Sequence, residues 1–188
     1  MHLVKPEGLC RRFKPKPANI HQESEKPKIN TGKLIPLTQG KFAIVDAEDY
    51  HWLSQYKWHA CKSRSTFYAA RRKGHTSISM HREIMCAPEG LVVDHIDHNG
   101  LNNRKSNLRL CTHSQNLLNR RIRPDCKSKY KGVVWDWRNR KWVARICINQ
   151  KRIHLGRFHN ERDAAIVYDR KAIELFGQFA CLNFPENI

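Results

Sequence analysis

The first part of the chain alternates short apolar stretches with polar turns, which is typical of short β-strands. Residues 34–45 (LIPLTQGKFAIV) predict two strands around a Gln-Gly turn. Asp46, followed by Asp49 three positions later, resembles a helix start and indicates a short helix over residues 46–56. The same patterns predict strands at residues 57–62, 66–72 and 76–80 and a brief helix at residues 81–85.

Residues 91–122 form a distinct pattern of two apolar segments around a polar one. The segments LVVDHI and LRLCT predict strands, and DHNGLNNRKSN between them predicts a long Asn-rich loop. The helix expected from His113 onward could be capped by either Thr112 or Ser114. The sequence therefore predicts a ββα element, which a basic linker containing Pro124 follows.

The last third of the chain combines three strand patterns with one helical pattern. KGVVWDW, KWVARICI and KRIHLGRF predict the strands, and alternation in the second places Trp142 and three aliphatic residues on one side. An amphipathic helix is expected between Asn160 as N-cap and Gly177 as C-terminal stop. Its predicted buried face is formed by Ala165, Tyr168, Ala172, Leu175 and Phe176. The fold class is therefore α+β, ending in a three-stranded antiparallel sheet packed on one helix.

The charge of the chain indicates a polyanionic partner. Its 188 residues contain 35 Lys+Arg and 17 Asp+Glu, for a net charge of +18. The charge is spread as +4, +5, +3 and +6 over residues 1–31, 32–87, 88–123 and 124–188. No apolar run reaches the roughly 18 residues of a membrane span, and the helix expected at 160–176 carries three cations and four anions. We therefore expect nucleic acid and no membrane as the partner.

Composition also predicts the domains. Residues 1–31 hold four of the eight prolines and seven cations, and we expect a disordered basic arm there. A first domain is expected at 32–123 with its ββα core at 91–122, then a linker at 124–129 and a second domain at 130–188. The seven cysteines are scattered without a C-x-x-C pair, which argues against a zinc site. With no secretory signal, they indicate reduced thiols, most of them in the core of a cytoplasmic protein.

The richest chemistry lies in Asp94-His95, Asn107 and Asn116. Hydrolysis of a phosphodiester needs an activated water, neutralisation of the phosphate charge and stabilisation of the leaving oxygen. His95 suits a general base, because an unperturbed imidazole has a pKa of about 6.5. The side-chain oxygens of Asp94 and Asn116 are hard ligands that suit Mg²⁺ or Mn²⁺. The Asn107 amide can hold the loop against His95 by bonding to backbone groups.

A plainer interpretation remains open for these residues. An Asp-His pair is often a surface or turn feature, and neighbouring strand residues point to opposite faces. Asp94 and His95 could serve one phosphate only near the end of a strand. For His98 and His113 we expect solvated surface positions, although His98 could also touch phosphate and His113 could begin the helix or lie near the metal.

The segment VVDHIDHNGLNNRKSNLRLCTHSQNLLNR (92–120) resembles the HNH endonucleases of the ββα-metal fold. It is similar to the homing branch, in which the final metal-binding His is Asn. The resemblance implies Asp94 and Asn116 as metal ligands, His95 as general base and Asn107 as the central Asn. The pair His81-Arg82 also occurs in relatives, which suggests a phosphate contact by Arg82; a plain surface pair is the alternative. Arg104 is a further expected DNA contact, and residues 33–86 resemble the leader of phage-type relatives.

The second domain resembles the AP2 DNA-binding domain in YKGVVWDW, KWVARI, LGRF, AAIVYDRKAIELFG and LNFP. Ten Lys/Arg and one acid occur over residues 127–157, interleaved with Trp135, Trp137 and Trp142, of which we expect Trp142 in the core. The resemblance implies a sheet inserted in the DNA major groove, where arginine can bond guanine edges. The expected DNA contacts are Lys131, Gly132, Arg138, Arg140, Arg145, Arg152 and His154.

Together these features predict a site-specific DNA endonuclease of the HNH homing type that uses Mg²⁺ or Mn²⁺ and no small-molecule cofactor. One such site cleaves one strand, so we expect nicking of double-stranded DNA by a monomer, with a dimer on DNA left open. The expected setting is the cytoplasm of a bacterial or phage-infected cell. Two alternatives are a non-catalytic AP2-type DNA-binding regulator and a basic RNA-binding protein, although no RNP-type motif is present.

Overall fold

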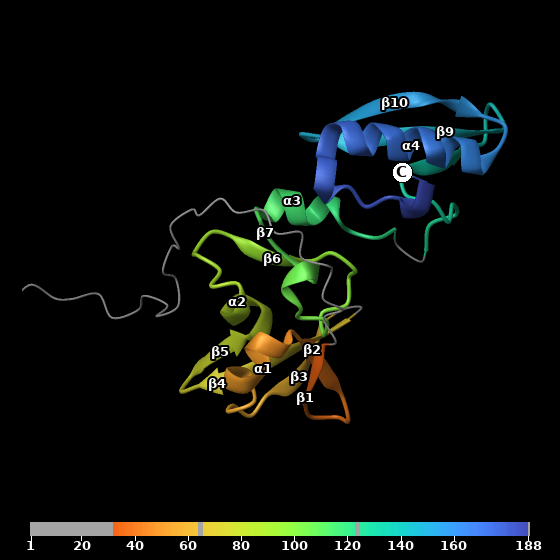
Figure 1. The fold of residues 1–188 in the computed structure, drawn as a ribbon. Helices are drawn as coiled ribbons and strands as arrows, with labels where there is room; N and C mark the ends of the chain where they lie inside the picture. Colours follow the sequence, from red (N-terminus) through yellow and green to blue (C-terminus); the bar gives the residue numbers. More distant parts are fainter. Residues whose placement is uncertain (1–31, 64–65, 123–124, 188) are drawn as a thin grey trace, which may run out of the picture. The chain divides into compact units, whose positions relative to one another are not determined.

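The computed structural model describes residues 32–63, 66–122 and 125–187, which form a mixed α+β protein as predicted (Figure 1). The chain divides into two compact units. The first contains the described residues up to Glu89 together with His95–Arg109, and the second contains Gly90–Asp94 and the residues from Leu110 onward. The basic arm expected at 1–31 lies outside the described residues.

The first unit contains two small antiparallel sheets and two short helices. Strands β1 and β2 form a hairpin around the predicted turn, in which Gln39 and Gly40 both have positive φ. Apolar side chains on one face of this hairpin and of the sheet β3-β4-β5 form the core together with Leu53 and Met80 of the helices. The elements are β1 (Lys33–Pro36), β2 (Phe42–Val45), α1 (Ala47–Leu53), β3 (His59–Ser63), β4 (Thr66–Lys73), β5 (Thr76–Ser79) and α2 (Met80–Ile84).

The predicted ββα element is present in the sequence order expected. Its elements are β6 (Val92–His95), the 3-10 helix η1 (Lys105–Asn107), β7 (Leu108–Cys111) and α3 (His113–Leu118). Strands β6 and β7 form a two-stranded sheet. Thr112 caps α3: its hydroxyl accepts from the Gln115 N–H at 3.2 Å and the Gln115 side chain accepts from the Thr112 N–H at 2.9 Å. This reciprocal pair decides between the two cap candidates and fixes where the helix begins.

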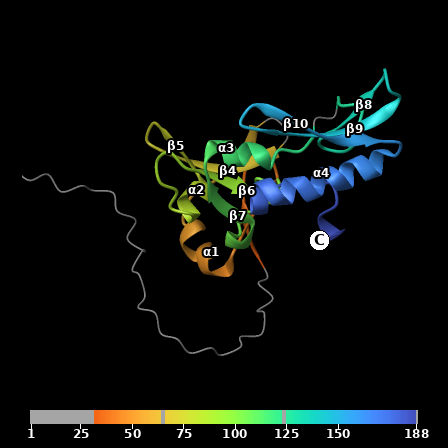
Figure 2. The same cartoon turned by 90° about the horizontal axis from the view of Figure 1, so that it is seen from above.

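The second unit is built on a three-stranded antiparallel sheet with α4 along one face (Figures 1 and 2). Its elements are β8 (Val133–Asp136), β9 (Lys141–Ile148), β10 (Lys151–Phe158), α4 (Glu161–Phe176) and the short turns η2 (Gly177–Phe179) and η3 (Pro185–Asn187). Val133, Ala144 and Ile146 of the sheet are buried against Ala165 and Tyr168 of the helix, with Trp142 packed beside them. The predicted core face and the place of Trp142 in it are thus confirmed.

Close packing at the start of β8 explains one glycine. Gly132 has φ 77°, and a Cβ built on it would lie 1.9 Å from Cδ2 of Tyr168. Any side chain there would therefore push the Tyr168 ring off the sheet. Burial also raises the pKa of this tyrosine, which is consistent with a hydroxyl that stays protonated in the core.

The expectation that most cysteines lie in the core is wrong for the described residues. Cys111 is buried and Cys181 half-buried, whereas Cys61, Cys86, Cys126 and Cys147 are exposed and form no disulfide among the described residues. Strand alternation gives the reason for two of them, because Cys61 and Cys147 follow buried Ala60 and Ile146 and so point to the other face. In the described part of the chain, every helix is too short or too polar to cross a bilayer.

Candidate active site

The polar loop between β6 and β7 (residues 96–107) is held closed by Asn107. Its backbone carbonyl accepts from the Ile96 N–H at 2.9 Å, and its side-chain oxygen accepts from the Asp97 N–H at 3.0 Å. Its amide nitrogen donates to Asp97 Oδ1 at 2.9 Å and to the Asn102 carbonyl at 2.8 Å. Asn107 is only 7% exposed. This amide therefore joins both ends of the loop, and the bonds to the Asp97 N–H and the Asn102 carbonyl are of the backbone kind that we expect from the sequence.

Asp97 supplies a fixed negative charge inside this loop. Partial burial alone would raise its pKa, but hydrogen bonds from the Asn102 side chain, the Asn99 N–H and the Asn107 side chain lower the pKa below its usual range. The bond from Asn102 Nδ2 to Asp97 Oδ2 is 2.7 Å long. Asp97 is therefore ionised at neutral pH and works as an acceptor that organises the loop.

The general-base candidate His95 is buried at the end of β6 and is 5% exposed. Its Nε2 lies 3.3 Å from Oδ1 of Asn103, which is fully buried. The imidazole also contacts two rings edge-on or tilted: that of His81 at 5.1 Å and that of Tyr68 at 5.5 Å between centroids. Three side chains, from β4, α2 and the polar loop, thus surround the base at the end of β6.

His81 is a half-buried partner in this cluster rather than a residue of a surface pair. Burial, together with the neighbouring His95 and Arg82, lowers its pKa to about 3. Its Nδ1 is buried and has no hydrogen-bond partner among the described residues. A neutral His81 leaves the His95 ring without a second positive charge beside it. Its neighbour Arg82 donates instead to the backbone carbonyls of Ala87 and Pro88, both at 3.2 Å.

The polar loop is fastened to the first unit from three sides. Gly100 lies against β4, where a Cβ would be 2.5 Å from the Phe67 carbonyl, and its N–H donates to Thr66 Oγ1 at 3.1 Å. Residues 101–103 pair with β2 through a parallel bridge between Ile44 and Asn102. Arg104, a predicted DNA contact, directs its Nε to Asn102 Oδ1 at 3.1 Å. These contacts leave the loop little freedom.

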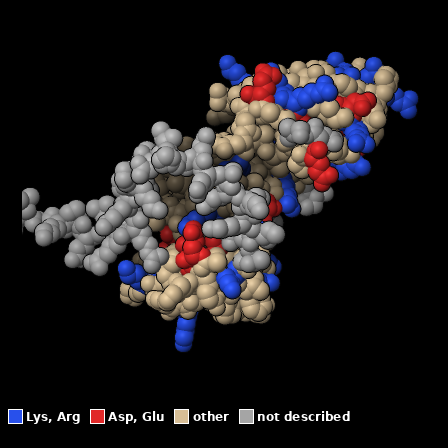
Figure 3. Space-filling view, in the orientation of Figure 1, with Lys and Arg blue, Asp and Glu red and all other residues tan. Residues whose placement is uncertain are grey.

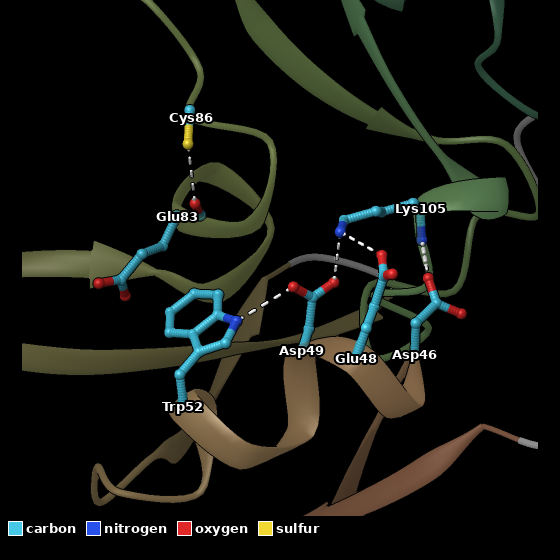
Figure 4. A network of polar contacts seen from close by, with 7 residues as sticks. All are labelled: Asp46, Glu48, Asp49, Trp52, Glu83, Cys86 and Lys105. Atoms are coloured by element: carbon cyan, nitrogen blue, oxygen red, sulfur yellow. Dashed lines mark hydrogen bonds and ion pairs between the residues drawn. The ribbon is translucent and has the colours of Figure 1, made fainter. Parts of the chain in front are cut away.

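Figure 4 shows the third attachment, in which Lys105 meets the acidic start of α1. Its backbone N–H donates to Asp46 Oδ2 at 2.8 Å, and its ammonium contacts Glu48 at 2.5 Å and Asp49 at 3.0 Å. Desolvation would lower the pKa of Lys105, but the two carboxylates raise it above its usual value. Asp49 also accepts from Trp52 Nε1 at 3.0 Å, so it is fixed on its own helix. The ammonium therefore stays charged and ties the loop to α1.

The metal-ligand candidates lie in the second unit. Asp94 is 7% exposed, and Asn119 donates from Nδ2 to both of its carboxylate oxygens, at 3.1 and 3.0 Å. Asn116 is half-buried on α3, one helical turn before Asn119. Side chains three positions apart share a helix face, so Asn116 lies on the face that Asn119 turns toward Asp94. Among the described residues, no group of three His, Cys, Asp or Glu could hold a metal ion.

His98 and His113 flank the candidate site in sequence and have backbone positions typical of a turn and of a helix start. His98 has a φ of 65° and its N–H donates to the His95 carbonyl at 3.0 Å, so it forms a turn in the polar loop. His113 is the exposed first residue of α3, which agrees both with the solvated surface position expected for it and with the helix start.

The sheet of the second unit carries its predicted DNA-contact residues in two groups. Arg145 and His154 are cross-strand partners, and Arg152 faces Cys147 two pairs further along. These side chains are exposed and alternate with the buried residues that face α4, so they lie on the outward face, the side of the sheet opposite α4. Arg138 and Arg140 are exposed in the turn between β8 and β9.

Lys131 and Gly132 are placed differently from this group. The Lys131 ammonium donates to the Leu118 carbonyl, and burial lowers its pKa. Gly132 packs on Tyr168, as described above. The surface over α4 shows acidic side chains among basic ones in Figure 3. Among the described residues of strands β8, β9 and β10, the one acid is Asp136, which is paired with Arg157 at 3.5 Å. Arg145 and Arg152 therefore have no acidic neighbour on their own strands.

Sequence reasoning missed Asn103 and Asn119, which contact His95 and Asp94 directly. A signal existed for Asn119, because it lies three positions after Asn116 on a predicted helix. The contact of Asn103 could not be derived from spacing, because it depends on the pairing of the polar loop with β2.

Comparison of the sequence with known proteins shows which family the chain belongs to. Residues 87–118 match the family model described as HNH endonuclease. The chain is 35% identical over 156 residues to "Uncharacterized HNH endonuclease L560" of Acanthamoeba polyphaga mimivirus, covering 80% of this chain and 79% of that protein. The chain belongs to the HNH endonuclease family. Membership in this family makes the protein a nuclease, with DNA as the implied substrate and a divalent metal as the usual cofactor.

Two further proteins are similar to different portions of this HNH endonuclease. "Protein 3.8" of Escherichia phage T7 is 32% identical over 130 residues, which span 63% of this chain and 96% of that protein. "Dehydration-responsive element-binding protein 2E" of Arabidopsis thaliana is 37% identical over 78 residues, or 35% of this chain and 30% of the plant protein. The plant similarity is partial and gives weak support to the AP2-like interpretation of the second domain.

Proposed function

We propose that this chain is a metal-dependent DNA endonuclease of the homing type that nicks double-stranded DNA. His95 acts as general base, Asp94 and Asn116 hold one divalent metal, and Asn107 maintains the loop. The observation that carries the proposal is the buried imidazole of His95, which ends β6 directly after buried Asp94 and has its Nε2 against Asn103. A buried polar cluster of this kind costs stability unless it is satisfied, and active sites are where proteins retain such clusters.

The donor set fits Mg²⁺ or Mn²⁺. A carboxylate and a side-chain amide offer hard oxygen ligands, and two protein ligands leave room for phosphate oxygens and water, as Mg²⁺ sites usually do. Asn119 Nδ2 contacts both carboxylate oxygens of Asp94 and so orients the carboxylate, as groups behind a metal ligand commonly do. When bound, the metal supplies charge neutralisation at the phosphate and at the leaving oxygen.

The residues of the chain then account for the proton and the substrate. The His95 imidazole accepts a proton from the attacking water, whose oxygen bonds to phosphorus while the bond to the 3′ oxygen breaks. The outward face of the second domain, with Arg145, Arg152 and His154, holds the duplex as in the AP2 resemblance. Phosphate contacts of this kind position a protein on DNA, and arginine contacts to base edges add specificity. The mimivirus and phage relatives support a setting inside infected cells.

A supercoiled-plasmid assay tests the proposal. A pool of plasmids with randomised inserts is incubated with the protein and Mg²⁺, Mn²⁺ or EDTA. We expect relaxed circles with either metal and none with EDTA, because a single site cuts one strand. His95→Ala should lower the rate by about 10²–10⁴-fold, the range for general acid–base catalysis, and should leave DNA binding intact.

The control is His75→Ala, which removes an exposed histidine in the turn between β4 and β5. It should cut at the wild-type rate. Binding of DNA with no metal-dependent relaxation would sink the nuclease proposal and favour a non-catalytic DNA-binding protein. Linear product in place of relaxed circles would contradict nicking alone.

A further inference from the structure

The polar loop pairs with β2, the second strand of the first hairpin, through an isolated parallel bridge. The Ile44 N–H donates to the Leu101 carbonyl at 2.8 Å, and the Asn103 N–H donates to the Ile44 carbonyl at 2.7 Å. These two bonds flank the parallel bridge between Ile44 and Asn102. They fix the register of the loop against β2, and the side chain of Asn103 is consequently fully buried beneath it.

The same register decides which end of the Asn103 amide faces His95. Asn103 Nδ2 lies 3.2 Å from the carbonyl oxygen of Leu101, which can only accept a hydrogen bond. The NH₂ group must therefore occupy that side, and Oδ1 faces His95 Nε2 at 3.3 Å. An amide oxygen also accepts only, so Nε2 must carry a hydrogen to bond to it. In the neutral imidazole, the lone pair is then on Nδ1.

We propose that Asn103 is a positioning residue that fixes His95 in the tautomer with hydrogen on Nε2, so that Nδ1 is the base of the reaction. This inference rests on the proposed nuclease function for its consequence. The water proton moves to Nδ1, the water oxygen bonds to phosphorus, and the electron pair of the broken bond leaves on the 3′ oxygen. The pairing of the loop with β2 thus determines which nitrogen reacts.

The packing around His95 supports this role for Asn103. The rings of His81 and Tyr68 pack against the imidazole, with their centroids 5.1 and 5.5 Å from its own. Asn103 lies on the loop, whereas these two rings come from α2 and β4, so the imidazole is confined from independent elements. Groups held in this way lose little entropy when the reaction begins.

The tautomer is read directly from the nitrogen NMR shifts of the imidazole. The sample is full-length protein labelled with ¹⁵N, free of metal and DNA, at about pH 8, where a histidine of ordinary pKa is neutral. The His95 signals are assigned by their loss in His95→Gln. We expect a protonated, pyrrole-type Nε2 and a pyridine-type Nδ1. A pyrrole-type Nδ1 would overturn the proposal, and this result needs no variant at Asn103 to fold.

Cleavage kinetics test the consequence. Asn103→Leu keeps the size of the side chain and removes the acceptor, so it should slow single-turnover cutting of bound plasmid by about 10²-fold, the loss typical of a misplaced reacting group. Its DNA affinity should change less than about twofold, because no phosphate contact is removed. Asn103→Asp keeps the acceptor oxygen and should recover part of the rate and the wild-type tautomer.

The control for general loosening of the loop is Asn99→Ala, which removes the bond from the Leu101 N–H to an exposed side chain without touching His95. It should cut within about twofold of wild type, since loss of one exposed hydrogen bond is a small change. Wild-type cutting by Asn103→Leu, or an equal loss in Asn99→Ala, would overturn the positioning role. A wild-type protein with the expected tautomer that cuts no DNA would refute the nuclease function and leave the tautomer assignment in place.

Discussion

The polar loop of the first unit and the outward face of the second use polar side chains in opposite ways. In the loop, Asn102, Asn103 and Asn107 are each at most 7% exposed, and their amides bond to other parts of the protein. On the outward face, Arg145 and Arg152 are exposed to solvent. The polar loop uses its polar groups in hydrogen bonds within the protein, whereas the outward face leaves them accessible to a partner.

This difference follows from the cost of burial. A buried amide without a partner loses about 1–3 kcal/mol, so the loop is stable only when its bonds are all made and it has one arrangement. An exposed guanidinium carries no such constraint and acts on a polyanion over about a Debye length. The comparison predicts that changes in the loop affect the chemical step and stability, whereas changes on the outward face affect affinity.

The largest effect is expected from Asn107→Ala, which removes the side-chain bonds that close the loop. Cleavage of bound DNA should fall by more than about 10²-fold, because the base and its loop lose their fixed geometry. The free energy of unfolding should fall by about 2 kcal/mol through the unsatisfied partners. Single-turnover kinetics and urea unfolding measure the two quantities.

Asn139→Ala is the matched control, because this exposed asparagine also bonds to an aspartate but lies in the turn between β8 and β9. It should leave cleavage of bound DNA unchanged. If Asn107→Ala weakened DNA binding and preserved the rate, the contrast between the two regions would be wrong.

A pH-dependent effect comes next. The pKa of half-buried His81 is lowered to about 3, whereas an unfolded histidine has a pKa of about 6.5. Between these values the unfolded state binds more protons, so stability is complete above about pH 6.5 and falls as the pH drops toward 3. The slope from this group is up to about 1.4 kcal/mol per pH unit. His81→Phe keeps a half-buried ring and should flatten this part of the profile.

Urea unfolding of both proteins at about pH 7 and pH 5 measures the difference, since these values bracket the upper half of the window. His75→Phe, an exposed histidine of the same unit, should keep the wild-type slope. Equal slopes for His81→Phe and wild type would show that His81 becomes protonated without unfolding, and that the ring cluster around His95 is more open than its burial indicates.

The sequence predicts most elements of both regions, because strand and helix patterns are local. Alternation in β9 places Trp142 and Ile146 toward α4, and residue type gives the cap at Asn160. For α3 it leaves two candidates, of which the structure selects Thr112. Charge counting likewise finds the cations of the second domain. What these signals share is that each depends on residues within a few positions of one another.

The candidate site could be predicted only where its residues form a motif. Asp94, His95 and Asn107 are found by spacing and resemblance, but the contact of Asn103 with His95 requires the distant strand β2. The same applies to Lys131, whose bond to the Leu118 carbonyl depends on how α3 packs in the second unit. Non-local pairing decides these positions, and no local pattern encodes it.

The smallest effect is expected on the outward face, from Arg145→Ala and Arg152→Ala. Each should weaken DNA binding by about tenfold if it contacts a base edge, and should reduce the salt dependence of binding by about one charge if it contacts phosphate. The rate on saturating DNA should stay unchanged. Arg170→Ala, an exposed arginine of α4, is the control and should bind as wild type. If neither sheet variant altered affinity, the cations of the outward face would be ordinary solvated charges, and the duplex would have to be held by another surface.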